Sequence, residues 1–213
     1  MKKILYLGTD STHFKGEGEI IHYPVIQIVP RSPFSQEIKQ AYAKLDEFTH
    51  LIFTSKNAVQ VFFSHLNALQ MDPNKIKQKS IIAVGDVTAL LLNQKGISVD
   101  QIADPPTQEG IIECIKDLKK PYIFLPKSSI SREVLQQFFI EKHLRYETID
   151  LYDTISLKQE PVPDLQSFDQ IVFTSPSTVK GFLEIYKTIP KEIECIAIGP
   201  ITEKALLIAR DFT

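Results

Sequence analysis

The sequence predicts an α/β protein made of two related lobes, and two observations carry this prediction. Short apolar runs alternate with segments of helical spacing along almost the whole chain, which is typical of parallel sheets covered by helices. Two segments also resemble each other, IFTSKNAVQVFF at 52–63 and VFTSPSTVKGFL at 172–183. Each is followed by a second matched segment, IIAVGDVTALLL at 81–92 and CIAIGPITEKALL at 195–207. The same signatures therefore occur in the same order in both halves.

The elements follow from hydrophobic periodicity and from punctuation by glycine, proline and capping residues. The first apolar run, ILYL, is a strand and is too short for a signal peptide. PVIQIVPRSP at 24–33 has no helical period and reads as an extended crossing between lobes. Thr107 is placed to cap one helix, and Gly96 to end another. Strands are expected at 4–7, 20–23, 51–53, 80–84, 99–102, 122–125, 146–151, 171–173 and 195–198, and helices at 36–45, 58–69, 88–94, 110–118, 132–142, 178–186 and 202–209.

This order of elements predicts an inserted domain. Residues 28–150 hold a full set of strands and helices, whereas the outer parts are complete only if they share one sheet. We therefore expect a discontinuous domain 1, residues 1–25 with 156–213, and a continuous domain 2 at 28–150, joined by linkers at 26–27 and 151–155. Domain 1 is expected to be shortened, because few residues separate its first two strands.

Composition favours a soluble cytoplasmic protein without a nucleic-acid surface. The 213 residues are 43% hydrophobic with a net charge of −2, and the 24 basic residues are scattered, which argues against a nucleic-acid surface. No apolar stretch reaches membrane-spanning length. The two cysteines, Cys114 and Cys195, have no partner at metal-ligand spacing and are interpreted as core thiols in a reducing compartment.

Polar side chains follow the repeated strands. Thr54, Ser55 and Asn57 lie after one strand, and Thr174, Ser175, Ser177 and Thr178 after the other. Ligands of parallel sheets settle at this edge, where helix N-termini offer free N–H groups. Ordinary helix capping by any one of these residues is the simpler interpretation, and only their repetition favours a ligand.

The second matched pair adds glycine turns to the candidate site. Gly85 and Gly199 permit a positive φ or a close backbone approach, and Thr88 and Thr202 follow three residues later in the first turn of a helix. Neither turn is a nucleotide-binding signature, because GxGxxG and GxxxxGK[ST] are both absent.

A third candidate is FLPKSSISRE at 124–133, read as a strand end, a polar turn and a helix start. Lys127, Ser128 and Arg132 there suit a polycarboxylate ligand, although a solvated helix start explains them equally well. Arg132 at a helix N-terminus opposes the macrodipole, which favours a functional reason for it.

The usual catalytic constellations are missing. Most of the histidines are expected at the surface, and they form no metal motif. The pairs Asp46 with Glu47 and Asp150 with Asp153 look like solvated edges. Tyr152, at a strand end in the return linker, is expected to turn its phenol toward a cleft between the lobes, or else to pack on a lobe surface. The five histidines are His13, His22, His50, His65 and His143.

The order of FTSKNAV, AVGDVTA, FLPKSSISRE, LYDT, FTSPSTV and AIGPITEKAL resembles uroporphyrinogen-III synthase. The resemblance implies two flavodoxin-like parallel-sheet domains joined by a two-stranded linker, with the active site in the cleft between them. It implies a cyclising hydro-lyase of haem biosynthesis that acts as a monomer without cofactor or metal. Its substrate is hydroxymethylbilane, and a transient contact with the upstream hydroxymethylbilane synthase is expected.

The same resemblance gives the residues roles. The family's tyrosine general acid matches Tyr152, its SPS serine matches Ser175, its IGPxT threonine matches Thr202, and its first FTS matches Thr54 and Ser55. Loss of the substrate's hydroxyl gives an azafulvene, and a spiro intermediate then delivers the inverted last ring. Positioning and proton donation are the protein's main contributions.

A second hypothesis is a two-lobed protein that binds a small anion or a tetrapyrrole without chemistry. It is motivated by the lack of an acid/base pair and by the shortened outer domain. A flavin- or phosphate-binding module rests on fold analogy alone.

Overall fold

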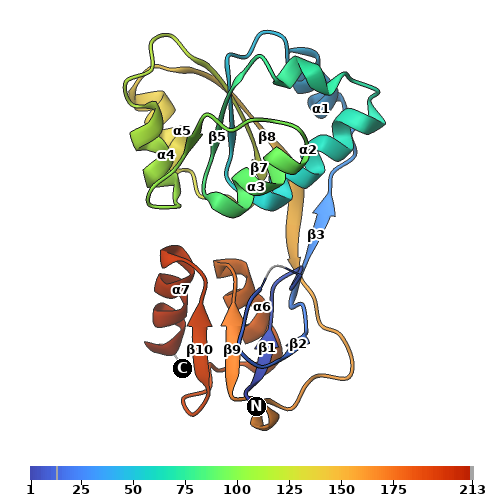
Figure 1. Ribbon diagram of the computed structural model, residues 1–213, viewed down its shortest axis with the longest axis vertical. Coiled ribbons are helices and arrows are strands. Elements are labelled where there is room, and N and C mark those ends of the chain that lie inside the picture. Colours follow the sequence, from blue (N-terminus) through green and yellow to red (C-terminus); the bar gives the residue numbers. More distant parts are fainter. Residues whose placement is uncertain (13, 212–213) are drawn as a thin grey trace. The chain divides into compact units, whose positions relative to one another are not determined.

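The computed structural model describes residues 1–12 and 14–211 and divides into two compact units (Figure 1). Unit 1 comprises Met1–Val29 and Thr154–Thr213, and unit 2 comprises Pro30–Asp153. Each unit contains a parallel sheet with helices, which confirms the predicted α/β class. His13 and Thr213, both considered above, lie outside the described residues.

Unit 1 is built on a four-stranded sheet of order β10-β9-β1-β2. The described pairs in this sheet are parallel, with Ile4 of β1 opposite Ile20 on one side and Gln170 on the other. Strand β1, near the start of the chain, therefore pairs with β9, which comes from the last quarter of the sequence. The strands are β1 (Lys3–Tyr6), β2 (Glu19–His22), β9 (Gln170–Phe173) and β10 (Glu194–Ala197), and the helices are η2 (Leu165–Ser167), α6 (Pro176–Tyr186) and α7 (Pro200–Asp211).

The core of unit 1 lies mainly between the sheet and helices α6 and α7. Leu5 and Phe173 from the strands pack with Phe182 and Leu206 from the helices. A smaller cluster on Ile4, Tyr6 and Val172 is covered by Phe14 rather than by a helix. A residue of the loop between β1 and β2 thus packs on this side of the sheet.

Unit 2 is built on a six-stranded sheet of order β3-β8-β7-β4-β5-β6. Its central pairs, β8-β7, β7-β4 and β4-β5, are parallel, so the carboxyl ends of these strands meet at one edge. The strands are β3 (Ile26–Pro30), β4 (His50–Phe53), β5 (Ser80–Ala83), β6 (Gln101–Ile102), β7 (Tyr122–Ser128) and β8 (Arg145–Ser156), and the helices are α1 (Gln36–Ala43), α2 (Lys56–Ala68), η1 (Pro73–Ile76), α3 (Asp86–Gln94), α4 (Gln108–Ile115) and α5 (Val134–Glu141).

Strands β3 and β8 are neighbours in the sheet, and each runs from one unit into the other. The expected linkers, 26–27 and 151–155, fall inside these two strands. The exact domain boundaries stay predictions.

Helix starts follow the capping expected from the sequence. Thr107 accepts a hydrogen bond from the Gly110 N–H and begins α4, as predicted. Ser55 and Ser175 cap α2 and α6 in the same way from extended backbone. Gly96, just after α3, has a φ of 75°, the left-handed conformation typical of a helix end.

Three predicted boundaries were wrong around one strand pair. Strand β7 continues to Ser128 rather than ending at 125, α5 begins at Val134 rather than at 132, and β8 continues to Ser156. The reason is that the ladder continues past Leu125, with Lys127 opposite Asp150 and Ser128 opposite Tyr152. This pairing converts a predicted polar turn into strand.

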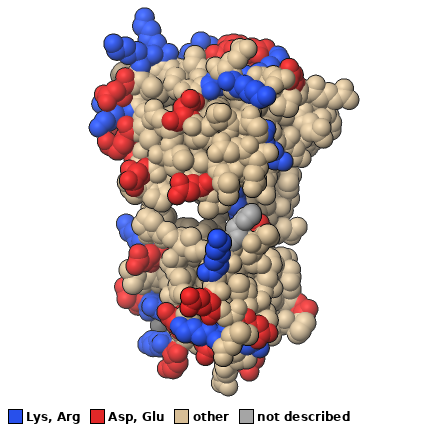
Figure 2. Space-filling view, viewed as in Figure 1, with Lys and Arg blue, Asp and Glu red and all other residues tan. Residues whose placement is uncertain are grey.

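Charges of both signs are interspersed over the face of the molecule in Figure 2. No helix in the described part of the chain has the length and apolar character needed to span a membrane.

Among the described histidines, His65 is buried and is an exception to the expectation that most histidines lie at the surface. It is 1% exposed on the inner side of α2 and lies 5.8 Å from the Tyr42 ring, because its position follows Phe62 at helical spacing. Both ring nitrogens of His65 are buried, and neither has a hydrogen-bond partner among the described residues. Burial lowers the pKa of His65, and the nearby backbone of Arg31 offsets part of that effect.

This burial predicts that stability falls in acid. Since the folded-state pKa of His65 lies below its unfolded value of about 6.5, its contribution is present above that pH and is lost as the pH falls below it. Urea unfolding at pH 7.5 and pH 5 should show a loss on the order of 1 kcal/mol that His65→Phe reduces. His143→Asn, at an exposed position with a φ of 52°, should leave the loss unchanged. Equal pH dependence in all three proteins would contradict the assignment.

Candidate active site

Three hydroxyl side chains meet at the carboxyl edge of the sheet in unit 2. The Tyr152 phenol oxygen lies 2.8 Å from the Ser55 Oγ, and either atom can be the donor. The side chain of Ser128 also forms a hydrogen bond with Tyr152. Tyr152, Ser55 and Ser128 were all predicted site residues, and the structure brings them together.

Each member of this cluster is positioned by a regular element. Ser55 follows β4 and is the N-cap of α2, where its Oγ accepts the Ala58 N–H at 3.0 Å. Ser128 ends β7, and Tyr152 lies on β8 directly opposite it. The β7–β8 register shifts between Lys127 and Ser128, and such an irregularity re-aims the side chains that follow it.

The phenol of Tyr152 is held in its protonated form. The residue is 4% exposed, and this burial raises the pKa of Tyr152 above its ordinary value of 10. The hydrogen bonds from Ser55 and Ser128 act in the opposite direction. A phenol in this state can donate a proton and then be stabilised as a phenolate by two hydroxyls.

Ion pairs flank Tyr152 on its own strand. Lys127 Nζ lies 2.6 Å from an Asp150 oxygen, with the lysine side chain 9% exposed. Arg31 joins Asp153 at 2.9 Å and Asp150 at 3.7 Å. The expectation that Asp150 and Asp153 are merely solvated edges was wrong, because both carboxylates pair with cations. Asp150 and Arg31 are charged neighbours of the candidate site that were not among the predicted site residues, since the register that aligns Lys127 with Asp150 was not predicted.

Arg132 lies elsewhere in unit 2. It lies one residue before Glu133, the N-cap of α5, rather than in the first turn of the helix. Its guanidinium forms two bonds to Glu109 of α4, at 2.6 and 2.9 Å. Arg132 lowers the pKa of Glu109 to about 2. Both partners are exposed, so the pair contributes little to stability, and a substrate carboxylate can compete for it.

The remaining predicted residues of unit 2 surround the starts of α2 and α3. Thr54 and Asn57 are half-buried beside Ser55. Gly85 is the N-cap of α3 with extended backbone rather than a positive φ, and a Cβ there would lie 3.1 Å from Pro106. Thr88 is 4% exposed, which leaves little of its side chain for a ligand.

In unit 1 the second FTS segment is mainly a cap. Ser175 accepts the Thr178 N–H, and the Thr178 hydroxyl accepts the Ser175 N–H, which completes a capping box. Ser177 is half-buried in the first turn of α6. Gly199 has a φ of 86°, as permitted by glycine, and Thr202 is 3% exposed.

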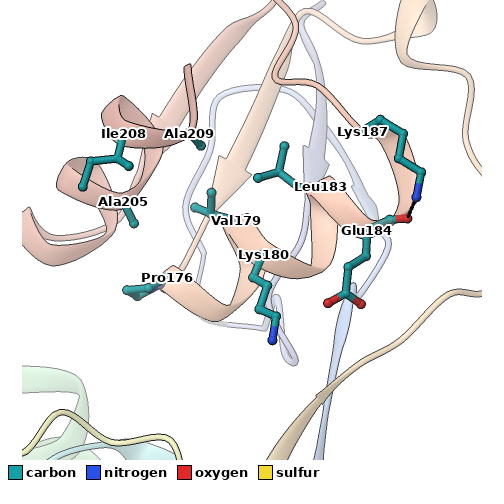
Figure 3. A pocket seen from close by; sticks show the side chains of 9 residues that line it. All are labelled: Pro176, Val179, Lys180, Leu183, Glu184, Lys187, Ala205, Ile208 and Ala209. Atoms are coloured by element: carbon teal, nitrogen blue, oxygen red, sulfur yellow. Dashed lines mark hydrogen bonds between the residues drawn. The ribbon is translucent and has the colours of Figure 1, made fainter. Parts of the chain in front are cut away.

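An apolar groove also lies between α6 and α7 of unit 1 (Figure 3). It measures about 610 Å³ and is lined by Val179, Leu183 and Ile208, with Lys180 and Glu184 projecting from α6. None of the predicted site residues lines it. Among the described residues, no group of three His, Cys, Asp or Glu side chains could hold a metal ion.

Comparison with known proteins gives one consistent result. The model of the family described as uroporphyrinogen-III synthase HemD matches residues 14–209. A porphyrin biosynthesis protein HemD from Ruminiclostridium josui is 28% identical over 197 residues, which cover 88% of this chain and 38% of that protein. A uroporphyrinogen-III synthase from Chlorobaculum parvum is 27% identical over 198 residues, covering 86% of this chain and 77% of that protein. This chain thus spans well under half the length of the first relative and most of the second.

Solved structures share the fold. A mutant uroporphyrinogen III synthase from Thermus thermophilus aligns with a TM-score of 0.66 at 14% identity, covering 98% of this chain and 89% of that one. The uroporphyrinogen-III synthetase of Helicobacter pylori aligns with a TM-score of 0.62 at 20% identity, with the same coverage. At these identities the likeness establishes the fold alone.

The ion pair of Lys127 predicts unequal costs for removing two neighbouring aspartates. Asp150→Ala leaves the buried lysine with only the Ser128 carbonyl at 3.4 Å, so the free energy of unfolding should fall by about 2–4 kcal/mol. Asp153→Ala is the matched control, because its pair with Arg31 is exposed and should cost less than about 1 kcal/mol. Urea denaturation measures both. Equal, small losses would show that the Lys127 pair is not buried in solution.

Proposed function

Since the chain belongs to the uroporphyrinogen-III synthase HemD family, we propose that it cyclises hydroxymethylbilane to uroporphyrinogen III with Tyr152 as the proton donor. The family predicted from the motif order is confirmed. The enzyme class that we propose with it is a cyclising lyase of tetrapyrrole biosynthesis. The substrate is a small molecule. The residues that perform the reaction belong to the proposal.

The observation that carries the proposal is the 2.8 Å contact between Tyr152 and Ser55. It lies where strands β4 and β7 end, beside Tyr152 of β8, at the edge where parallel sheets bind ligands. Of the described side chains at this edge, Tyr152 combines a raised pKa with hydroxyl partners. It therefore keeps its proton at neutral pH until an acceptor is positioned beside it.

In the first step Tyr152 protonates the terminal hydroxyl of the linear tetrapyrrole, directly or through water. The C–O bond breaks, water leaves with the bonding electron pair, and the pyrrole nitrogen supplies electrons to form the azafulvene. The last ring attacks through its substituted carbon, and the spiro intermediate rearranges. The protein contributes a folded substrate conformation and stabilisation of charge.

The proposed substrate-binding set combines backbone amides with hydroxyls and cations. Lys127 and Arg132 would exchange their present carboxylate partners for substrate acetates and propionates. The full set is Thr54, Ser55, Asn57, Gly85, Thr88, Lys127, Ser128, Arg132, Ser175, Ser177, Gly199 and Thr202.

The proposal extends to the setting of the enzyme. We place it in the cytoplasm as a monomer without cofactor, and we include a transient contact with the upstream hydroxymethylbilane synthase. The two units would be related flavodoxin-like domains linked through β3 and β8.

An isomer assay tests the activity. Hydroxymethylbilane is generated in situ in the presence of the chain, and the products are oxidised and separated into isomers I and III. We expect isomer III to predominate. Isomer I alone, formed at the enzyme-free rate, would contradict the proposal, and tight binding of the linear tetrapyrrole without conversion would favour a binding protein.

Tyr152→Phe tests the proton donor. Loss of the phenol hydroxyl should lower kcat about 100-fold or more, because general acid catalysis contributes roughly 10²–10⁴. Tyr146→Phe, on the same strand, is the matched control and should keep normal turnover. Thermal unfolding should show both variants folded. Unchanged kcat in folded Tyr152→Phe would remove Tyr152 from the mechanism.

A further inference from the structure

We propose that Ser55 is a positioning residue for Tyr152, donating a hydrogen bond to the phenolate and linking it to the N-terminus of helix α2. This inference rests on the proposed function, in which Tyr152 gives up a proton. It assigns Ser55 to the phenol rather than to the substrate, the role that the family resemblance gave it.

The geometry places Ser55 between two partners. Its Oγ lies 2.8 Å from the Tyr152 oxygen and accepts the Ala58 N–H at 3.0 Å. A hydroxyl has one proton to donate and two lone pairs to accept with. Ser55 can therefore cap the helix and donate to Tyr152 at the same time.

Proton transfer fixes the direction of this hydrogen bond. While Tyr152 is neutral, either oxygen can donate. When its O–H bond breaks and the proton goes to the departing hydroxyl, the phenolate has no hydrogen left and can only accept. Ser55 must then be the donor. A hydrogen bond to an ionised oxygen is about twice as strong as a neutral one, so the contact favours the charged state over the ground state.

Helix α2 strengthens this donor. The helix runs from Lys56 to Ala68 and has no acidic residue in its first turn to oppose the positive end of its dipole. The Ala58 N–H polarises the Ser55 hydroxyl that it binds, which makes that hydroxyl a better donor. The positive end of the helix thus stabilises the phenolate charge through one intervening hydroxyl, that of Ser55.

The surroundings keep the contact strong and specific. Tyr152 is 4% exposed, and Ser128 supplies a second side-chain hydrogen bond to it. The nearest charges on β7 and β8, Lys127, Asp150 and Asp153, are held in ion pairs with one another or with Arg31. Hydroxyls, rather than full charges, therefore provide the described hydrogen bonds to the phenol.

The twin segment supplies a natural contrast. Ser175 caps α6 from nearly the same backbone conformation, yet its capping box is completed by Thr178. In the first segment the residue equivalent to Thr178 is Ala58, which has no hydroxyl. The described side-chain contact of Ser175 is its cap, whereas Ser55 has a further partner in Tyr152.

The test removes the hydroxyl while keeping the cap. Ser55→Gly removes the hydroxyl but nearly preserves the cap, because glycine is itself a good N-cap residue. Ser55→Ala loses the same hydroxyl with a larger capping cost, and Ser55→Thr keeps the hydroxyl. All seven tyrosines are replaced by a fluorinated tyrosine, whose phenol is more acidic, and titrated by fluorine NMR. Tyr152→Phe identifies the Tyr152 signal by its loss.

In Ser55→Gly we expect the pKa of residue 152 to rise by about one pH unit or more, and kcat to fall about tenfold or more with KM unchanged. Ser55→Ala should match it and Ser55→Thr should restore both values. Thr107→Ala, a cap deletion on α4, should change neither. A raised KM at normal kcat would instead assign Ser55 to substrate binding and overturn the inference.

The two proposals fail separately. An unchanged pKa of residue 152 in Ser55→Gly overturns the present inference and leaves Tyr152 as the acid. Normal turnover in Tyr152→Phe overturns the role of Tyr152, while the pKa shift in Ser55→Gly would still be observed.

Discussion

The candidate site depends on the register of β7 against β8. Parallel pairing carries the ladder past Pro126, so that Lys127 lies opposite Asp150, and the shift that follows places Ser128 opposite Tyr152. Along this strand pair an ion pair, Lys127 with Asp150, is followed by a pair of neutral hydroxyl residues, Ser128 with Tyr152. A phenol beside an unpaired lysine would ionise more readily, whereas this phenol is buried among hydroxyls and keeps its proton.

The two repeated segments use the same helix cap, a serine after a buried strand, but the two serines differ in their further contacts. In both, a buried strand ends in Thr-Ser, and the serine turns the chain into a helix by accepting an N–H. The Thr178 hydroxyl accepts the Ser175 N–H and completes a capping box, whereas the Ser55 hydroxyl contacts Tyr152 on a neighbouring strand. The described contacts of the cap serine are therefore local in one segment and include a tertiary contact in the other.

Much of the fold could be predicted because its signals are local. Apolar periodicity, capping residues and glycines gave nearly every strand and helix to within a few residues. The features that were mispredicted depend on contacts between residues distant in the sequence. Pro126 and Lys127 are unfavourable strand residues, and only the ladder to β8 makes them strand. His65 is polar, so its burial becomes visible only when α2 packs on Tyr42.

The same division applies to the site. Residue types and their positions at strand ends identified Tyr152, Ser55 and Ser128, but not that they touch, since the contact depends on strand register. The cations were recognised by charge, whereas their partners, Asp150 and Glu109, are distant in the sequence or looked like solvent-facing acids. Sequence patterns thus predict which polar residues lie at strand ends better than they predict which of these residues contact each other.

The order of strands in unit 1 has a consequence for synthesis on the ribosome. Strand β1 emerges first, yet one of its two neighbours, β9, is made only after all of unit 2. Unit 2 is continuous in sequence and can fold as soon as it has emerged. The apolar strand Lys3–Tyr6 must therefore remain unpaired on the β9 side while unit 2 is synthesised, and an unpaired strand edge of this kind is prone to wrong association during folding.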